Sequence, residues 1–495
     1  MSQLKRLAGD TAIYGISSIL GKSINYLLVM LHTSVFLREE LGVFTYLYAY
    51  VAFLNIIYTF GMETAFFRFI NKSKSNDAYN TATSLVVTIS TLISGLIYFQ
   101  AESIAAFINF PGTGHLIEWL AIILWIDGIM AIPFALIRQQ NKAKLFATVK
   151  VGNILLNVGL QLFFLLALPV MSQADGFGSS WYNPELGIGY IVLANLIANA
   201  MYFPMLWKYI VKIRIRFDWI QLKPMLIYAI PIVIMGLAGM VNEMLDKILI
   251  AHLLPDTFYS DMDSTAAIGV YGQIFKLSIF MMLAIQAFRY AGEPFFFSNA
   301  KDKNAPELFA RVMHYFVLAC LVILFVVSIN IDLLALMFLR DPDYRVVLYL
   351  VPILLFGKLF YGIYVNLNVW FKLIDKTIYG TYFSLIGASV TILGNVLLLP
   401  VIGLVGCVVS SVLCYVTMCI LCYIMGQKYY PIPYNFVKLL PHFIFTIAVV
   451  VLSFFVKHEN FIIDSAIRIL LTIIFVFTLV YIENPKRVKK QTDIS

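Results

Sequence analysis

The sequence contains few charged residues. Asp, Glu, Lys and Arg together make up 13% of its 495 residues, whereas soluble globular proteins carry about 25%. Hydrophobic residues make up 61%, and the mean hydropathy is +0.87. So few polar side chains cannot cover the surface of water-soluble domains of this size. The composition therefore excludes a soluble protein and predicts an integral membrane protein that crosses the bilayer many times.

Residues that build metal and catalytic sites are also scarce. The five cysteines lie in apolar stretches, and the six histidines stand singly, without a paired metal-binding spacing. There is no Walker motif, so ATP is not expected to be the direct energy source. The motif at Asp341–Asp343 resembles the Asp-x-Asp of glycosyltransferases, but we predict that it forms a turn. The sequence thus predicts no catalytic residue, no metal site and no cofactor.

Long apolar segments are abundant, and fourteen of them are near the roughly 20 residues that a transmembrane helix needs. They cover residues 11–36, 41–62, 80–101, 116–137, 147–170, 187–207, 224–254, 267–292, 311–331, 346–371, 377–399, 402–425, 437–456 and 461–482. We therefore predict an all-α polytopic membrane protein with about fourteen transmembrane helices.

Positive charge is distributed unevenly between the loops. If both termini lie on one side, the loops on that side hold 25 of the 35 Lys and Arg residues, and the opposite loops hold 5. Cytoplasmic loops of membrane proteins are enriched in Lys and Arg. Both termini are therefore predicted to be cytoplasmic. The net charge of +8 is explained by basic loops that set the orientation in the membrane, so nucleic-acid binding is not expected. The basic stretch 208–223 is interpreted as a linker between halves, or as an interfacial amphipathic helix.

Two segments indicate an internal repeat. Residues 42–69 and 269–297 both open with Gly-Val-aromatic and close with a glutamate followed by phenylalanines, at Glu63 and at Glu293. Many transporters consist of duplicated bundles. We predict two pseudo-symmetric six-helix lobes, 1–215 and 216–430, followed by two helices and a cytoplasmic tail in 431–495. The alternative is that two Phe-rich helices look alike without duplication.

Several charges fall inside the predicted spans, where each costs about 2.5–3.5 kcal/mol at the bilayer centre. They are Lys22, Asp127, Glu243, Asp246, Lys247, Lys276 and Lys358. These side chains must face the protein interior or water. The spacing predicts a pair between Glu243 and Lys247, and Lys276 could neutralise Asp246. The first span also has a polar stripe that includes Lys22 and Asn25, which indicates a helix lining a wet cavity, or close packing through small residues.

Some sequence blocks resemble a known family, the polysaccharide transporters or lipid-linked oligosaccharide flippases of the MOP superfamily. The blocks are LAGDTAIYGISSILGKSINYLLV, GVFTYLYAYVAFLNIIYTFGMETAFFRF, FRYAGEPFFF and Asn395-x4-Pro400-x2-Gly403-x2-Gly406. Lipid II flippases and MATE drug exporters are relatives of this family. The resemblance implies alternating access between two six-helix lobes, a location in the bacterial inner membrane, and an undecaprenyl-pyrophosphate-linked sugar as cargo. It also implies a central cavity lined by the first helices of each lobe.

The charged residues divide into two predicted roles. Cations suit a pyrophosphate, and the predicted cargo-binding residues are Lys22, Asn25, Lys247, Lys276, Arg289 and Lys358. Carboxylates repel this cargo but bind a proton or a cation, and the predicted coupling or gating residues are Glu63, Asp127, Glu243, Asp246 and Glu293. Coupling to an H⁺ or Na⁺ gradient, or to the membrane potential, is therefore expected. Lys22 and Lys358 have no local counter-ion in the sequence and are the predicted pyrophosphate ligands.

The predicted function is a flippase for a lipid-linked oligosaccharide, such as a polysaccharide or O-antigen repeat unit. A MATE-like cation-coupled multidrug exporter is the alternative, although that family has twelve spans. A membrane polymerase or glycosyltransferase is less favoured because the loops are too short for a catalytic site. Expected partners are the cargo and membrane lipids, with loose association with polymerase and glycosyltransferases and no nucleic acid. The sequence does not identify the sugars of the cargo. It also does not distinguish a polysaccharide repeat unit from lipid II as the cargo.

Overall fold

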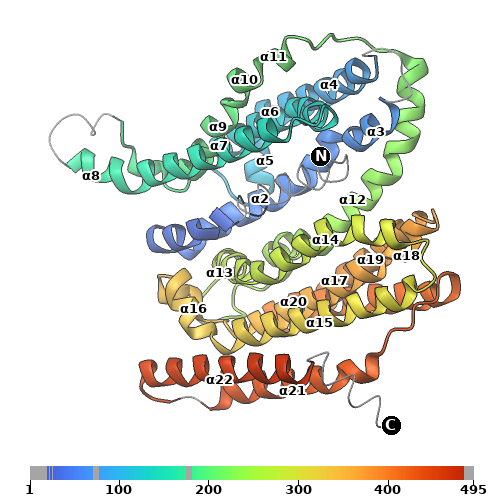
Figure 1. Cartoon of the computed structure of the whole chain (residues 1–495). Helices are drawn as coiled ribbons and strands as arrows, with labels where there is room; N and C mark the ends of the chain where they lie inside the picture. The colour runs from blue at the N-terminus through green and yellow to red at the C-terminus, as the bar shows by residue number, and fades with distance from the viewer. Residues whose placement is uncertain are drawn as a thin grey trace. The chain divides into compact units, whose positions relative to one another are not determined.

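The computed structural model describes residues 19, 21, 23–24, 26–70, 77–173, 181–456 and 458–483, and every regular element in these residues is helical (Figure 1). The elements of the first half are α2 (Arg38–Thr59), α3 (Met62–Phe69), α4 (Asp77–Phe99), α5 (Ala101–Phe107), α6 (Gly114–Gln139), α7 (Ala143–Leu162), a π-helix (Phe163–Ala167), α8 (Leu168–Gln173), a 3-10 turn (Pro184–Leu186), α9 (Gly189–Ala200), α10 (Tyr202–Met205) and α11 (Trp207–Ile210). The elements of the second half are α12 (Trp219–Leu253), α13 (Ser264–Leu277), α14 (Ile279–Asn299), α15 (Ala305–Ile329), α16 (Ile331–Phe338), a 3-10 turn (Pro342–Arg345), α17 (Leu350–Leu367), α18 (Val369–Leu373), α19 (Ile378–Ile402), α20 (Leu404–Tyr429), α21 (Phe436–Phe455) and α22 (Phe461–Ile482).

The predicted all-α polytopic membrane fold is confirmed. In the described residues, 11 helices are long and apolar enough to cross a membrane, and the pair α13 and α14, broken at Ser278, brings the number to 12. Two shorter apolar helices, Tyr26–Val35 and Gly189–Met205, coincide with the predicted first and sixth segments. Each of the fourteen predicted segments thus coincides, wholly or in part, with a helix. The Asp341 side chain accepts a hydrogen bond from the Asp343 amide (2.9 Å), so this motif forms the predicted turn.

The chain packs as two compact units. Residues 1–273 and 376–410 form the first unit, and residues 274–375 and 411–495 form the second. These units are defined by which helices pack together, whereas the predicted lobes were defined by the repeated sequence motifs. The units therefore do not test the lobe boundaries. The predicted lobes at 1–215 and 216–430, with the helices in 431–495, therefore stay a prediction.

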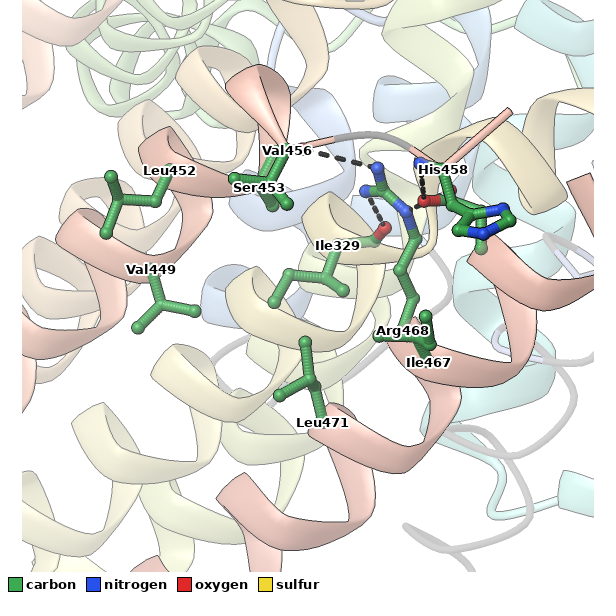
Figure 2. A pocket seen from close by; sticks show the side chains of 10 residues that line it. Ile329, Val449, Leu452, Ser453, Val456, His458, Ile467, Arg468 and Leu471 are labelled. Atoms are coloured by element: carbon green, nitrogen blue, oxygen red, sulfur yellow. Dashed lines mark hydrogen bonds and ion pairs between the residues drawn. The ribbon is translucent and has the colours of Figure 1, made fainter. Parts of the chain in front are cut away.

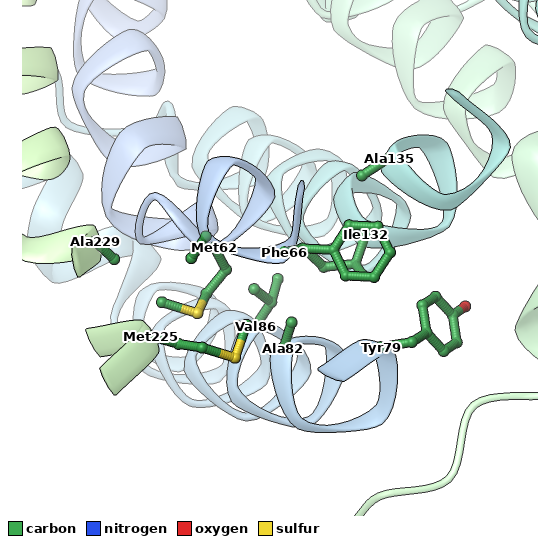
Figure 3. Close-up of a cluster of buried hydrophobic side chains, with 10 residues drawn as sticks. Met62, Phe66, Tyr79, Ala82, Val86, Ile132, Ala135, Met225 and Ala229 are labelled. Atoms are coloured by element: carbon green, nitrogen blue, oxygen red, sulfur yellow. The ribbon is translucent and has the colours of Figure 1, made fainter. Parts of the chain in front are cut away.

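A core of the first unit forms where the second span breaks. Phe60 and Gly61 both adopt left-handed backbone, with φ of 44° and 64°, and separate α2 from α3. Figure 3 shows Met62 and Phe66 of α3 packed with residues of α4, α6 and α12, including Met225. A Cβ on residue 61 would lie 3.1 Å from the Ala229 carbonyl oxygen. Glycine therefore permits both the left-handed turn and the close packing of this segment on α12.

The basic stretch 208–223 does not form the single amphipathic helix considered above: it contains the end of α11, an extended part and the start of α12. Residues 213–218 contain no helix and lead directly into α12. The Arg214 amide donates to Asn80 Oδ1 (3.3 Å) and the Arg216 amide donates to Ser84 Oγ (2.8 Å), both on α4. Side chains of α4 thus satisfy backbone groups that a helix would have satisfied internally. Asp218 then caps α12 by accepting from the Ile220 amide (3.0 Å).

In the second unit, α21 and α22 are fastened to α15 by a buried arginine. Arg468, within α22, is only 6% exposed, although the loop charge count from the sequence included it on the outward side. Its guanidinium pairs with Asp464 (2.5 Å) and donates to the carbonyls of Ile329 (2.9 Å) and Ser453 (3.2 Å), as Figure 2 shows beside an apolar pocket. A cation at the last residue of α15 also stabilises the negative end of the helix dipole.

A second polar contact fastens the same helices at their opposite ends. Glu483, directly after α22, lies 2.8 Å from Lys438 Nζ and 3.1 Å from His314 Nε2 through its Oε2. Its Oε1 lies 3.3 Å from His442 Nε2. Burial raises the pKa of the Glu483 carboxyl, but hydrogen bonds from Lys438 and His314 outweigh burial and hold the pKa below its usual range.

We expect Glu483→Gln to lower the melting temperature of the purified protein. Hydrogen bonds to charged groups contribute about 1.5–3 kcal/mol. A carboxyl whose pKa is lowered by folding stabilises above its unfolded pKa of about 4.3, and this stabilisation is lost as the pH falls through the lower folded value. His314, His442 and Lys438 are the other titratable groups that face it. Thermal unfolding in detergent at pH 7 and pH 4 should show a smaller acid-induced loss in the variant than in the wild type.

The matched control is Glu459→Gln, at an exposed glutamate. It should leave the melting temperature nearly unchanged, because surface substitutions usually change stability by less than about 0.5 kcal/mol. Equal acid sensitivity in wild type and Glu483→Gln would contradict the stabilising role of this carboxylate.

Candidate functional site

A polar network surrounds Asp127 on α6 within the first unit. Asn199 of α9 donates to Asp127 Oδ1 (3.0 Å), and Asn153 of α7 donates to Asn199 Oδ1 (3.0 Å). Lys150 of α7 is near enough for its charge to act on the Asp127 carboxylate. The Lys150 ammonium also lies 4.1 Å from the centroid of the Phe134 ring. Asp127, for which the sequence indicated no local partner, is therefore held by an amide and faces a cation.

Lys150 corrects the charge count made from the sequence. The sequence count included it among the cytoplasmic loop charges although it falls within the predicted segment 147–170, and the structure places it within α7, a helix that belongs to a membrane span. Long apolar neighbours on both sides, such as Phe146 and Leu155, continue the helix past it. Removing it from the loop total leaves the asymmetry strongly in favour of cytoplasmic termini. The orientation itself stays a prediction.

The network extends along one face of α7. Lys150, Asn153, Asn157 and Gln161 recur every three or four residues, the spacing of one helix face. Gln161 Oε1 accepts a hydrogen bond from His32 Nε2 (2.7 Å), and Gln161 Nε2 donates to Asn157 Oδ1 (3.0 Å). The stripe spans about 16 Å at 1.5 Å per residue. This spacing was a sequence signal for the network, and it was missed because Lys150 had been counted among the loop charges.

A second buried cluster lies on α12 and α13, also in the first unit. Asp246 and Lys247 are 3% and 4% exposed, and their Oδ1 and Nζ atoms are 3.0 Å apart. The Tyr271 hydroxyl donates to Asp246 Oδ2 (2.6 Å). Lys247 Nζ donates to the backbone carbonyl of Glu243 (3.0 Å). The structure thus brings three predicted residues together, but the ion pair is between Lys247 and its neighbour Asp246, and Lys247 reaches the main chain of Glu243.

One turn before Asp246 on α12, Asn242 is linked through hydrogen bonds to buried polar residues of α19. The Thr391 hydroxyl donates to Asn242 Oδ1 (3.0 Å), and Asn395 donates to the Thr391 carbonyl (2.8 Å). All three side chains are less than a tenth exposed. Buried polar groups in a membrane are costly unless they are paired, so two polar networks in one unit point to sites that do more than pack.

Glu63 and Glu293 form equivalent ion pairs in the two halves. Glu63 pairs with Arg138 at the end of α6, and Glu293 Oε1 lies 2.5 Å from Lys372 Nζ on α18. Each pair joins the second span of its half to the fourth. All four side chains are partly exposed, between 27% and 42%. The matching of these pairs supports the predicted repeat, and both glutamates lie at the ends of their spans, away from the deep clusters.

The remaining predicted residues are distributed differently. Lys358 is 3% exposed, and its ammonium lies 4.8 Å from the centroid of Phe275 and 5.4 Å from that of Tyr415. Lys276 is half-buried at the end of α13 and belongs to the second unit, so its predicted pairing with Asp246 stays a prediction. Arg289 is exposed on α14. Lys22 and Asn25 lie outside the described residues.

Metal ligands are not gathered in this site. Among the residues that the structure describes, no group of three or more His, Cys, Asp or Glu side chains could hold a metal ion. The two polar networks each contain one carboxylate and one lysine, together with amides and hydroxyls. Such a group can hold a proton or exchange a bound cation.

The chain is similar to known membrane transporters. Residues 36–173 match a family described as "Polysaccharide biosynthesis protein". No curated protein sequence matches the chain. The structure of "Lipid II flippase MurJ, inward closed conformation" is similar over 95% of this chain and 98% of its own, with a TM-score of 0.70 and 14% identity.

Two structures of multidrug resistance MATE family transporters of the MOP superfamily, one inward-facing and one outward-facing, also have a similar fold. The inward-facing structure gives a TM-score of 0.61 at 13% identity, over 83% of this chain and 94% of its own. The outward-facing structure gives 0.56 at 14% identity, over 86% and 98%. The predicted resemblance is therefore confirmed at the level of the fold: the protein is a multi-pass membrane protein with the fold of these flippases and transporters, and part of it matches a polysaccharide biosynthesis family.

Proposed function

Because the chain has the fold of MOP-superfamily transporters, we propose that it is a flippase, not an enzyme. It moves an undecaprenyl-pyrophosphate-linked oligosaccharide, such as a polysaccharide or O-antigen repeat unit, across the bacterial inner membrane. The observation that carries this proposal is the match to a polysaccharide biosynthesis family on a chain whose fold resembles a lipid II flippase over 95% of its length. Alternating access between two lobes exposes the cargo site first inside and then outside.

The charge of the cargo sets what the protein must provide. A pyrophosphate carries about two negative charges, and an unpaired charge in a low-dielectric interior costs far more than thermal energy. Lysines inside the spans supply the opposite charge, though without the bidentate fork of arginine. We assign the pyrophosphate to Lys22 and Lys358, with Asn25, Lys247 and Lys276 as further contacts. Exposed Arg289 suits an entry contact.

The carboxylates are assigned to coupling and gating. A carboxylate repels a pyrophosphate but holds a proton or a cation when the cavity is empty. Asp127 faces Lys150 and Asn199, and Asp246 faces Lys247 and Tyr271. A coupling ion that competes with the lysine for the carboxylate would change the arrangement of these helices. Glu63, Glu243 and Glu293 complete the proposed coupling and gating set.

We expect Asp127→Asn to change how transport depends on the ion gradient or membrane potential. Asparagine keeps the size of the side chain and a carbonyl that can accept from Asn199, but it removes the charge that Lys150 faces. Transport in vesicles with imposed H⁺, Na⁺ or potential gradients should show a reduced dependence on one of the three. Asp77→Asn, at the start of α4, is the control. Unchanged gradient dependence at wild-type protein levels would contradict a coupling role.

Loss and restoration of the chain test the function as a whole. A strain lacking it should accumulate lipid-linked oligosaccharide on the cytoplasmic side, and expression of the chain should restore surface polysaccharide. Loss of drug efflux without accumulation of lipid-linked sugar would favour the MATE-like exporter instead. Co-purification of polymerase or glycosyltransferases with the chain would test the proposed loose association with these enzymes.

A further inference from the structure

The repeat-related glycines Gly42 and Gly269 lie against each other in the first unit. Each is the glycine of a Gly-Val-aromatic motif, near the start of α2 and of α13 respectively. A Cβ built on Gly42 would collide with the Thr265 carbonyl, and one built on Gly269 would collide with the Arg38 carbonyl and lie 2.9 Å from the Gly42 nitrogen. Thr265 stands four positions before Gly269, and Arg38 stands four positions before Gly42, so each glycine meets the equivalent carbonyl of the other helix. The contact is therefore reciprocal, as expected of two repeats that meet on their symmetry axis.

The geometry of this crossing requires glycine on both helices. At each glycine, the Cα hydrogen that occupies the Cβ position points at a carbonyl oxygen of the other helix. This is the arrangement of a Cα–H···O contact, which recurs where helices approach through small residues. One turn further along, a Cβ on Gly272 would lie 3.2 Å from Thr45 Cβ. Backbone thus meets backbone here over about one helical turn.

Polar pairs surround the crossing. The Arg38 guanidinium donates to the Asp261 carbonyl (2.9 Å) and lies 3.7 Å from its carboxylate. The Tyr46 hydroxyl lies 3.0 Å from His252 Nε2 and 3.1 Å from the Tyr50 hydroxyl. Water can replace each of these hydrogen bonds when the helices part. Where the two glycines meet, the contact is made by backbone and by exchangeable polar pairs instead of interlocking apolar side chains, which favours opening and closing.

We propose that the Gly42–Gly269 crossing is the outward gate of the transporter, closed in this structure. The inference rests on the proposed function and on the orientation that the Lys and Arg distribution predicts, which puts the starts of α2 and α13 at the outward face. Separation of these two helices opens the exit for the cargo. Since α2 and α13 are the second spans of their halves, the gate joins one lobe to the other along the repeat.

Disulfide trapping tests whether the contact forms in the membrane. Thr45→Cys combined with Gly272→Cys puts two Cβ atoms about 3.2 Å apart, a few tenths of an ångström below the usual disulfide range of about 3.5–4.5 Å. Mild oxidation of membranes should cross-link this pair, and neither single variant should change its mobility. Thr45→Cys with Gly95→Cys is the matched control, because nothing lies within 4 Å of a Cβ at residue 95. Failure of the first pair to cross-link overturns the proposal.

Accessibility tests whether the contact is a gate. Gly42→Ala and Gly269→Ala cannot close the crossing, so a membrane-impermeant maleimide added outside should label an Asn55→Cys reporter, deeper in α2, several-fold faster than in the otherwise wild-type chain. Gly95→Ala should leave the rate unchanged. Equal rates in all variants, or faster labelling only from the cytoplasmic side, overturns the outward assignment. If the alanine variants do not reach the membrane, the disulfide pair still decides: labelling of the reporter should fall on oxidation and recover on reduction.

Both readouts are independent of the cargo. If the flippase assignment is wrong, export of lipid-linked saccharide gives no signal even for the wild type, while cross-linking and labelling still report on the gate. If the flippase assignment is right, oxidation of the double variant Thr45→Cys with Gly272→Cys should stop export, and reduction should restore it. Export that continues in fully cross-linked protein overturns the gate alone.

Discussion

Lys358→Ala is expected to abolish export of the lipid-linked saccharide without lowering the amount of protein in the membrane. The same result is expected for Lys22→Ala. In the structure Lys358 is buried against the rings of Phe275 and Tyr415, and a desolvated cation over an aromatic face gains about 2 kcal/mol. The proposed role requires that this ammonium leaves the rings for the pyrophosphate when the cavity opens. Lys358→Arg should retain part of the activity, because charge matters more than shape at a point contact.

Two further variants separate charge from packing. Lys358→Met keeps most of the side-chain volume but removes the charge, so it should fail in export as completely as the alanine variant. Lys428→Met is the matched control, since Lys428 is also in the second unit and lies 5.7 Å from the centroid of Tyr429, but is exposed on the last turn of α20. Surface polysaccharide and membrane protein levels are the measurements. Full complementation by Lys358→Ala and Lys22→Ala would mean that the pyrophosphate is held elsewhere.

Asp246→Ala is expected to be the most destabilising substitution in the first unit. It removes the carboxylate that Lys247 Nζ contacts at 3.0 Å, and both side chains are almost fully buried. Breaking a buried ion pair by removing one partner costs about 3–5 kcal/mol, because the remaining charge is left in a low-dielectric interior. The Tyr271 hydroxyl also loses its acceptor. Thermal unfolding in detergent and the yield from membranes should both fall sharply.

The double variant Asp246→Leu with Lys247→Met should recover most of this stability. Replacing both charges by apolar side chains of similar size removes the desolvation cost of each. If the pair acts in gating, the stable double variant should still be inactive in export. An exposed pair provides the comparison: Arg216 and Asp77 lie 3.9 Å apart with the arginine 72% exposed, so Asp77→Ala should cost no more than about 1 kcal/mol. Similar losses in both alanine variants would contradict the role of burial.

The ion pairs at Glu63 and Glu293 show how the repeat appears in three dimensions. The sequence indicated the two glutamates by their position before a Phe cluster, and the structure adds Arg138 and Lys372 as partners. Each cation lies at the end of the fourth span of its half. A duplicated bundle places equivalent residues in equivalent packing, so the same contact recurs even though one cation is arginine and the other lysine.

The sequence by itself determined the helices, and the reason is the solvent. In a bilayer every backbone polar group must be satisfied within its own segment, so a stretch of about 20 apolar residues has one available structure. This is why all fourteen predicted segments coincide with helices, and why the turn at Asp341 was predictable from its local residues. The similar motifs at Gly42 and Gly269 were also visible, although nothing in the sequence indicated that they touch.

Only the tertiary structure decided which polar residues meet. Asp127 lies about 70 residues from Asn199, and Asp246 accepts from Tyr271 of the next helix; such contacts depend on how helices pack, which no local spacing specifies. Lys150 was counted with a cytoplasmic loop because it stands near the start of the predicted segment 147–170, where basic residues usually flank a span. The extended linker before α12 was misread because its hydrogen bonds go to side chains of α4. Local sequence fixes a helix through its own hydrogen bonds, whereas a charge inside a membrane is stable only through partners that other helices bring to it.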